Sequence, residues 1–358
     1  MSEWKKVKLG DILDFYNGKA IKVTNGPIPV YGSNGIIGYT EKPLYHNAII
    51  IGRVGAYCGS VAICQNAFWA SDNTIIVKAK NGESNIFYYF LLKIMNLNLY
   101  AGGAAQPLIT QTTLKSLETA IPPINTQHHI ATILSRYDSL IENYQKQIKL
   151  LEEAAQRLYK EWFVDLHFPG HENTKIVDGV PEGWEKKPVD SIYSIKYGKN
   201  LSTKLISESG EFPVYGANGV IGYYDKANCN EQVVLITSRG NGSGDVLMTY
   251  HKDAFITNNS FIVLPLEDYS YCQLPFTYQF LKNANFRTVR TGAAQPQLTN
   301  QSIHTVDVVL PSKNIIIDYC DKVSYINNKI IILRNQIRLL TEARDRLLPK
   351  LMSGEIAV

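Results

Sequence analysis

The sequence has few of the features that mark a secreted, membrane or metal-binding protein. It has no run of about 18 apolar residues, and residues 1–6 lack the apolar segment of a signal peptide. Its five cysteines form no CxxC pair and do not recur at matching places, so we expect neither a disulfide framework nor a zinc site. They are Cys58, Cys64, Cys229, Cys272 and Cys320. These absences predict a cytoplasmic protein in a reducing compartment, without contact to a membrane.

A strong excess of either charge is also missing. The formal net charge is +4, and each half carries only +2, from 17 basic against 15 acidic residues in 1–178 and 19 against 17 in 179–358. This balance permits nucleic-acid binding through local patches and does not require it. Aromatic residues make up 11% of the chain, with 22 Tyr, which suits a recognition surface.

The strongest positive feature is an internal repeat. The motif Gly103-Ala-Ala-Gln-Pro107 returns as Gly292-Ala-Ala-Gln-Pro296, at an offset of 189 residues (292 − 103). An earlier block, residues 29–39, returns as residues 213–223 at an offset of 184. Two copies at this period indicate a domain duplication, because a solenoid needs at least three repeats of about 20–50 residues.

Each copy reads as a compact module followed by a long helix. Short β-type runs punctuated by glycine come first, then a helical stretch rich in Phe, Tyr and Leu, then the repeated motif. The expected fold class is α+β, with two mixed α/β modules related by a pseudo-twofold internal repeat. The expected boundaries are 1–125 for the first module, 126–166 for a central helix, 167–183 for a linker, 184–313 for the second module and 314–355 for a C-terminal helix.

Both helical regions carry long apolar stripes. In the first, Leu134, Ile141, Ile148, Ala155 and Trp162 recur every seven residues beside a second stripe with spacings of three and four. A sustained heptad pattern favours two long helices, about 57 Å each at 1.5 Å per residue, that pack on each other as a coiled coil. The alternative for either stripe alone is a buried core helix.

Catalytic motifs are incomplete in this sequence. Neither glycine cluster, 32–38 or 240–244, has the spacing of a phosphate-binding loop, and residues 72–74 are not followed by the Pro-Pro-aromatic of an amino-methyltransferase. Glu185-Lys-Lys187 ends like a metal nuclease site but has no well-placed Asp pair, and reads better as a solvated charge run. The pair His128-His129 opens a helix and has no second copy. We therefore expect no catalytic and no metal-binding residues.

Two arginines follow apolar strands in glycine-rich loops, Arg53 in residues 52–59 and Arg239 in residues 238–244. Such an arginine can approach a base edge and donate to guanine O6 and N7, the commonest specific DNA contact. The sequence pairs the two as equivalents, with Tyr57 and Asn241 as further candidates on the same loops. The alternative is a structural arginine that neutralises a carboxylate.

Six more candidates come in pairs. Amide side chains that could pair with adenine are Asn34 with Asn218 and Gln106 with Gln295, and lysines suited to phosphate contact are Lys19 and Lys199. The asparagines could instead simply provide the left-handed conformation of an Asn-Gly turn, and the glutamines could pack within their loops. Differences between the two copies predict that each module reads a different DNA sequence.

At this point the chain resembles the specificity subunit of type I restriction-modification systems over essentially its whole length. The resemblance rests on the two-module layout, the Gly-Ala-Ala-Gln-Pro loops, Leu158-Tyr-Lys-Glu-Trp-Phe163, and Arg344-Asp-Arg-Leu-Leu-Pro-Lys-Leu-Met-Ser-Gly-Glu355. It implies two target-recognition domains for a bipartite double-stranded DNA target, joined by two long antiparallel coiled-coil helices that dock two modification (methyltransferase) subunits. Restriction subunits with ATP-dependent translocase and endonuclease activity then join the complex. It also implies that this chain catalyses nothing and binds no cofactor, S-adenosylmethionine being bound in the methyltransferase subunits.

Two other functions compete with this one: a coiled-coil assembly protein without sequence-specific DNA binding, and a stand-alone nuclease with an unrecognised site. Tests of the purified chain for cleavage and methyl transfer separate the nuclease from the specificity subunit. The helical stripe adds one further expectation. Tyr137, Tyr144, Trp162 and Phe163 exceed what a two-helix seam needs, which predicts that another subunit covers part of it.

Overall fold

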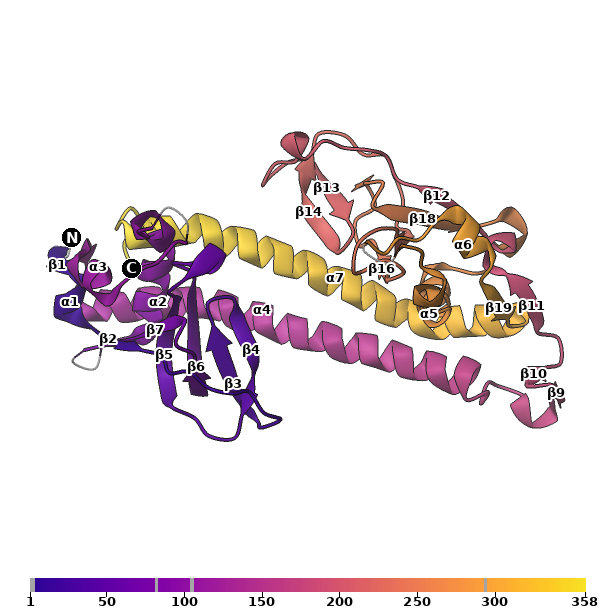
Figure 1. The fold of residues 1–358 in the computed structure, drawn as a ribbon, viewed down its shortest axis with the longest axis horizontal. Coiled ribbons are helices and arrows are strands. Elements are labelled where there is room, and N and C mark those ends of the chain that lie inside the picture. The colour runs from indigo at the N-terminus through magenta and orange to yellow at the C-terminus, as the bar shows by residue number, and fades with distance from the viewer. Residues whose placement is uncertain (1–3, 81–82, 104–105, 293–294) are drawn as a thin grey trace. The chain divides into compact units, whose positions relative to one another are not determined.

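The computed structural model describes residues 4–80, 83–103, 106–292 and 295–358, which group into two compact units. Unit 1 comprises residues 1–143 with 337–358, and unit 2 comprises residues 144–336. Each unit holds one β-rich module and a part of each long helix, α4 (Ile124–Tyr159) and α7 (Lys313–Met352) (Figure 1). The domain boundaries expected from the sequence, which separated helices from modules, stay predictions.

The module of unit 1 is built on a six-stranded sheet with the order β2-β7-β5-β6-β3-β4. Its neighbours are antiparallel except β3 and β6, which pair in parallel through Val30 with Trp69 and Tyr31 with Ala70. A separate pair, β1 (Lys5–Lys8) with β8 (Glu118–Ile121), lies next to α1 (Leu9–Ile12) and α3 (Gln111–Ser116). The sheet strands are β2 (Leu13–Asn17), β3 (Ile28–Gly32), β4 (Gly35–Thr40), β5 (Tyr45–Gly52), β6 (Val61–Ala70) and β7 (Thr74–Ala79).

The core of unit 1 lies between this sheet, α2 (Asn85–Ile94) and the long helices. The side chain of Ser84 caps α2 by accepting from the Phe87 N–H, and the helix then buries Phe87, Leu91 and Leu92. The start of α4 and the end of α7 contribute to the same core. This arrangement makes parts of both helices integral to the module.

The module of unit 2 repeats this plan with two smaller sheets, in the orders β12-β18-β15-β16 and β14-β13-β17. The parallel pairing recurs, with Val214 opposite Phe255 and Tyr215 opposite Ile256. The strands are β12 (Tyr193–Tyr197), β13 (Phe212–Gly216), β14 (Gly219–Tyr224), β15 (Val234–Thr237), β16 (Val246–Met248), β17 (Phe255–Ile256) and β18 (Ser260–Pro265). The remaining elements are β9 (Ile176–Val177), β10 (Val180–Pro181), β11 (Glu185–Pro188), α5 (Leu274–Asn283), α6 (Asn300–His304) and β19 (Asp307–Leu310).

The two sheets of unit 2 correspond to the single sheet of unit 1 with one strand interrupted. In unit 1 the first residue of the parallel pairing, Trp69, lies six residues after Ile63 (69 − 63). In unit 2 its equivalent, Phe255, lies seven residues after Met248, the equivalent of Ile63 (255 − 248). The segment of unit 2 that corresponds to β6 contains this extra residue and forms two separate strands, β16 and β17. A shared register shift in the β3–β4 and β13–β14 hairpins supports the duplication inferred from sequence.

An ion pair joins the two long helices in each unit. In unit 1 the Arg344 Nη1 lies 2.6 Å from Asp138 Oδ1, and in unit 2 the Arg334 Nη2 lies 2.8 Å from Glu152 Oε1. Both helices begin shortly after a proline, α4 after Pro123 and α7 after Pro311, in keeping with the preference of proline for helix starts. On α4 the heptad positions Leu134, Ile141 and Ile148 are buried, whereas Leu140 of the other stripe is 44% exposed.

The expectation that Trp162 and Phe163 await another subunit is wrong. Both lie on a π-helical turn, Lys160–Val164, that follows α4, and Trp162 is only 5% exposed. Their rings pack in the aromatic core of unit 2, with Tyr319 6.0 Å from Trp162 and 5.1 Å from Phe163 between ring centroids. The seam looked overfilled because the sequence does not reveal that the module itself covers the end of this helix.

Among the residues that the structure describes, no helix is both long and apolar enough to cross a bilayer.

Candidate functional site

The Arg53 loop of unit 1 is joined by backbone hydrogen bonds to the end of the Gly-Ala-Ala-Gln-Pro motif. The Ile109 N–H donates to the Arg53 carbonyl at 3.0 Å, and the Gly55 N–H donates to the Pro107 carbonyl at 3.0 Å. The Arg53 N–H donates to Asn73 O at 2.8 Å. Ala104 and Ala105 of the motif lie outside the described residues.

Unit 2 makes the same three bonds. The Leu298 N–H donates to Ser238 O at 2.7 Å, the Gly240 N–H donates to Pro296 O at 2.9 Å, and the Ser238 N–H donates to Asn259 O at 2.8 Å. The loops that the sequence singled out are therefore brought together in the same way in both units. Ala293 and Ala294 lie outside the described residues.

These bonds correct the pairing of the two arginines. Arg53 corresponds to Ser238, and Arg239 corresponds to Val54, which pairs with Leu108 as Arg239 pairs with Gln297. Neighbouring side chains on extended backbone point to opposite sides, so the arginines project differently; Arg53 is half-buried and Arg239 exposed. Pairing the two arginines by residue identity was wrong, because the glycine-rich loops are shifted by one residue relative to that pairing.

The same residue correspondence between the two loops locates the other two candidates, Tyr57 and Asn241. Tyr57 corresponds to Gly242 and Asn241 to Ala56, and both candidates are exposed. The equivalent residues Cys58 and Ser243 both turn inward. The Cys58 Sγ donates to the Arg53 carbonyl at 3.2 Å, and the Ser243 Oγ donates to the Ser238 carbonyl at 3.3 Å. Different surface side chains are thus carried by one loop conformation.

Lys19 and Lys199 do occupy equivalent positions. Their N–H groups donate to Ala70 O at 2.9 Å and to Ile256 O at 3.0 Å, and both residues are exposed. A Cβ on the preceding Gly18 would lie 1.9 Å from the Ser71 carbonyl oxygen, so only glycine permits this close approach. The backbone thereby fixes where each lysine leaves the surface.

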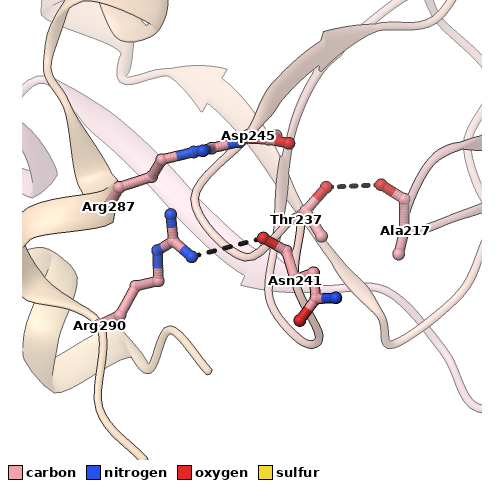
Figure 2. A network of polar contacts seen from close by, with 6 residues as sticks. All are labelled: Ala217, Thr237, Asn241, Asp245, Arg287 and Arg290. Carbon is pink, nitrogen blue, oxygen red and sulfur yellow. Dashed lines mark hydrogen bonds and ion pairs between the residues drawn. The ribbon is translucent and has the colours of Figure 1, made fainter. Parts of the chain in front are cut away.

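Asn34 and Asn218 lie at the tips of the β3–β4 and β13–β14 hairpins, and both are exposed. The left-handed backbone belongs to the following glycines, with φ of 87° at Gly35 and 110° at Gly219. The alternative that the asparagines serve this conformation is therefore wrong. The hairpin of unit 2 is tied to the arginine loop, because the Thr237 Oγ1 donates to Ala217 O at 2.6 Å (Figure 2).

Gln106 and Gln295 are exposed and follow turns at glycines with φ of 90° and 85°. Packing of the glutamines within the loop is not favoured by this exposure. The ion-pair alternative for the arginines also lacks support. Within the described part of the chain, no carboxylate lies within 4.0 Å of the Arg53 or Arg239 guanidinium. All ten candidate residues thus lie on surface loops, and those of each unit belong to one connected set.

Sequence reasoning missed two arginines beside the loop of unit 2. The Arg287 Nε donates to Asp245 Oδ1 at 2.8 Å, and the Arg290 Nη1 donates to the Asn241 carbonyl at 3.4 Å (Figure 2). Their positions in unit 1 hold Asn98 and Ala101. The search for paired residues could not find them, because they occur in one copy only.

The nuclease-like triplet forms ordinary surface ion pairs. Lys187 lies 2.6 Å from Glu185, and Lys186 lies 3.3 Å from Asp307. Hydrogen bonds with Glu185 and Tyr269 raise the pKa of Lys187, which keeps this side chain protonated and unsuited to act as a base.

Comparison with known proteins identifies the family. The model of the type I restriction modification DNA specificity domain matches residues 1–153 and 181–338. The chain belongs to the type I restriction-modification specificity subunits. Members of this family recognise DNA targets and are not themselves enzymes.

Individual relatives agree. The chain is 27% identical to the type I restriction enzyme MjaIX specificity subunit of Methanocaldococcus jannaschii, over 92% of this chain and 84% of that one. It is 23% identical to the HindI specificity subunit of Haemophilus influenzae, over 99% of this chain and 100% of that one. The fold resembles the crystal structure of a type I S subunit from Mycoplasma genitalium, with a TM-score of 0.64, 22% identity, and coverage of 98% and 96%.

Proposed function

We propose that this specificity subunit recognises a bipartite double-stranded DNA target, one half-site for each unit, through ten loop residues. The observation that carries this proposal is the shared set of backbone bonds that assembles the same loops in both units. A common scaffold with different surface side chains suits two readers with different sequence preferences. The residues are Lys19, Asn34, Arg53, Tyr57 and Gln106 in unit 1, and Lys199, Asn218, Arg239, Asn241 and Gln295 in unit 2.

The side chains divide by chemistry. The equivalent lysines Lys19 and Lys199 are exposed on fixed backbone and contact phosphates, which positions DNA without reading it. Arg53 and Arg239 contact base edges, where a guanidinium can donate two hydrogen bonds to one guanine. Because the two arginines lie one residue apart in register, we expect them to reach different base positions within their half-sites.

The two long helices, α4 and α7, pack as an antiparallel coiled coil and dock two modification (methyltransferase) subunits. Those subunits bind S-adenosylmethionine, and restriction subunits then join the complex. Exposed apolar side chains on these helices support docking, since such surface is costly unless a partner covers it. Examples are Leu150 (65% exposed), Tyr325 (75%), Ile332 (51%) and Leu339 (50%).

Alanine substitution of each arginine tests this proposal. Arg53→Ala relaxes sequence preference in the first half-site alone and Arg239→Ala in the second alone, each by about 1–3 kcal/mol for a lost bidentate contact. The measurement is selection from a randomised duplex DNA pool by the chain co-purified with its modification subunits.

A uniform loss of affinity across all sequences would assign the arginines to phosphates. Unchanged selection at both half-sites by folded variants would remove these loops from DNA recognition.

A further inference from the structure

Unit 2 has a charged cluster that unit 1 lacks. Asp245 ends the 238–245 loop, and its equivalent in unit 1 is Ser60. The backbone N–H and carbonyl of Asp245 make the same hydrogen bonds within their loop as those of Ser60. Arg287 faces Asp245 with Nε at 2.8 Å, and Asn98 is its equivalent. These two positions hold neutral residues in unit 1 and an ion pair in unit 2, directly beside the loop that carries Arg239.

Arg290 lies next to this ion pair without sharing it. Its position is fixed because Thr291 and Gln297 exchange backbone bonds at 2.9 Å, as Gly102 and Leu108 do in unit 1. The Nη1 donates to the Asn241 backbone carbonyl, and the Asn241 side chain points away from the guanidinium (Figure 2). Over the described residues, Arg290 has no carboxylate within 4.0 Å, and its buried Nε has no hydrogen-bond partner.

The chemistry of this arginine suits a ligand with acceptor atoms. A guanidinium has five N–H donors in a fixed plane, and the bond to the Asn241 carbonyl occupies one of them. Because a backbone carbonyl holds one edge, the guanidinium is oriented before a ligand arrives, which favours bidentate donation to a planar acceptor edge. The exposed Lys199 is better suited to a phosphate, where a point charge suffices.

We propose that Arg290 is a second specificity-determining residue of unit 2, donating to the O6 and N7 edge of a guanine in the second half-site, and that Arg287 is a positioning residue that neutralises Asp245. This inference rests on the proposed function of the loops. Without Arg287, the Asp245 carboxylate would attract Arg290 and repel the DNA backbone. Unit 1 has Ala101 in place of Arg290, so its half-site lacks this contact.

The test compares Arg290→Ala with Arg290→Lys in the chain co-purified with its modification subunits, by selection from a randomised duplex DNA pool. Loss of one bidentate contact lowers preference for one base pair of the second half-site by about 5- to 150-fold, the equivalent of about 1–3 kcal/mol. Lysine keeps the charge but not the planar fork, so both variants should lose the preference. Preference at the first half-site, measured on the same protein, reports that the complex is intact.

Two further variants sharpen the test. Arg287→Ala should lower the same preference, and Asp245→Asn added to it should restore most of the loss, because the charge that Arg287 neutralises is then gone. Ala101→Arg places a guanidinium at the equivalent point of unit 1 and should create a guanine preference at one position of the first half-site.

Three outcomes overturn the proposal: unchanged selection by folded Arg290→Ala, wild-type selection by Arg290→Lys, or uniform weakening on every sequence. The last two would mark a phosphate contact. If Arg53→Ala and Arg239→Ala also change nothing, the loops do not read DNA and the proposed function fails as well. If those two act and the Arg290 variants do not, only this inference fails.

Discussion

The two units hold their candidate DNA-contacting loops alike but differ where the sheet meets the long helices. In unit 1 a cleft of about 390 Å³ is bordered by β3, β6, α2 and α4, through residues such as Tyr31, Gln65, Tyr89 and Asp138. Burial beside Cys64 raises the pKa of Tyr31 to about 12, so its phenol stays protonated. The equivalent cavity of unit 2 has only about 30 Å³.

One substituted residue on the cavity wall differs in size between the two units. Tyr250 takes the place of Gln65, and the centroid of its ring lies 3.7 Å from the Arg334 guanidinium carbon. The Arg334 Nη2 in turn donates to Glu152 Oε1. The interruption between β16 and β17 frees this segment to turn toward the helices, and Tyr215 Oη accepts from the Tyr250 N–H at 3.2 Å. Duplication therefore kept the loop backbone and allowed the support beneath it to diverge.

The ends of the helices differ in the same manner. Tyr159, Trp162 and Phe163 seal the core of unit 2 where Leu348, Leu351 and Met352 seal that of unit 1, at the common offset of 189. Aromatic rings supply more buried area per residue than these aliphatic chains. We expect the seal of unit 2 to contribute more to its stability.

The largest expected effect comes from breaking that seal. Trp162→Ala removes a buried indole that packs against Phe163 and Tyr319, and should lower the free energy of unfolding by about 3–5 kcal/mol. Hydrogen exchange of the native protein locates the loss, which should fall on residues 144–336.

Leu351→Ala is the matched change in unit 1, and we expect about 2–4 kcal/mol there. Equal losses in the two units, or a Trp162 effect that spreads evenly over both, would contradict the difference drawn between the seals.

A smaller effect is expected from exchanging the cleft residues. Tyr250→Gln removes the ring under Arg334 and should cost about 1–2 kcal/mol, since a partly exposed cation–π contact and some apolar burial are lost. Thermal unfolding of the variant measures the cost, and its crystal structure should show the cleft of unit 2 enlarged toward that of unit 1.

Gln65→Tyr is the reciprocal control. At the 189-residue offset Arg334 corresponds to the uncharged Gln145, so the substitution recreates the ring of Tyr250 without its Arg334 partner and should add little stability. A gain as large as the loss at Tyr250 would show that ring burial alone, without Arg334, closes the cleft.

Much of this fold follows from the sequence. The duplication, the β-rich modules, both long helices and the loops that contain the candidate residues were all indicated by repeated motifs and apolar periodicity. The helix expected at residues 126–166 is observed as α4 and the π-helical turn after it, which together extend from Ile124 to Val164. These features depend on local pattern, which a single chain displays directly.

The errors concern long-range packing and register. The shift between Arg53 and Arg239 is visible in backbone bonds to residues distant in the chain, such as Pro107 and Pro296, which lie more than 50 residues away. Burial of Trp162 depends on Tyr319, and the Arg287–Asp245 pair joins segments 42 residues apart. No local periodicity encodes such contacts, so repeats alone could not reveal them.

The smallest expected effect tests whether the loop scaffolds are truly interchangeable. Cys58→Ser and Ser243→Cys exchange the inward side chains that donate to the Arg53 and Ser238 carbonyls. Each carbonyl also accepts a backbone N–H, from Ile109 and Leu298, so neither is left unsatisfied by the exchange. Burial raises the pKa of the Cys58 thiol, which therefore stays protonated and able to donate near neutral pH. Each variant should stay within about 1 kcal/mol of the parent by denaturant unfolding, with DNA selection unchanged. A loss above about 2 kcal/mol in one unit alone, or altered selection at one half-site, would show that equal backbone bonds conceal different packing beneath the two loops.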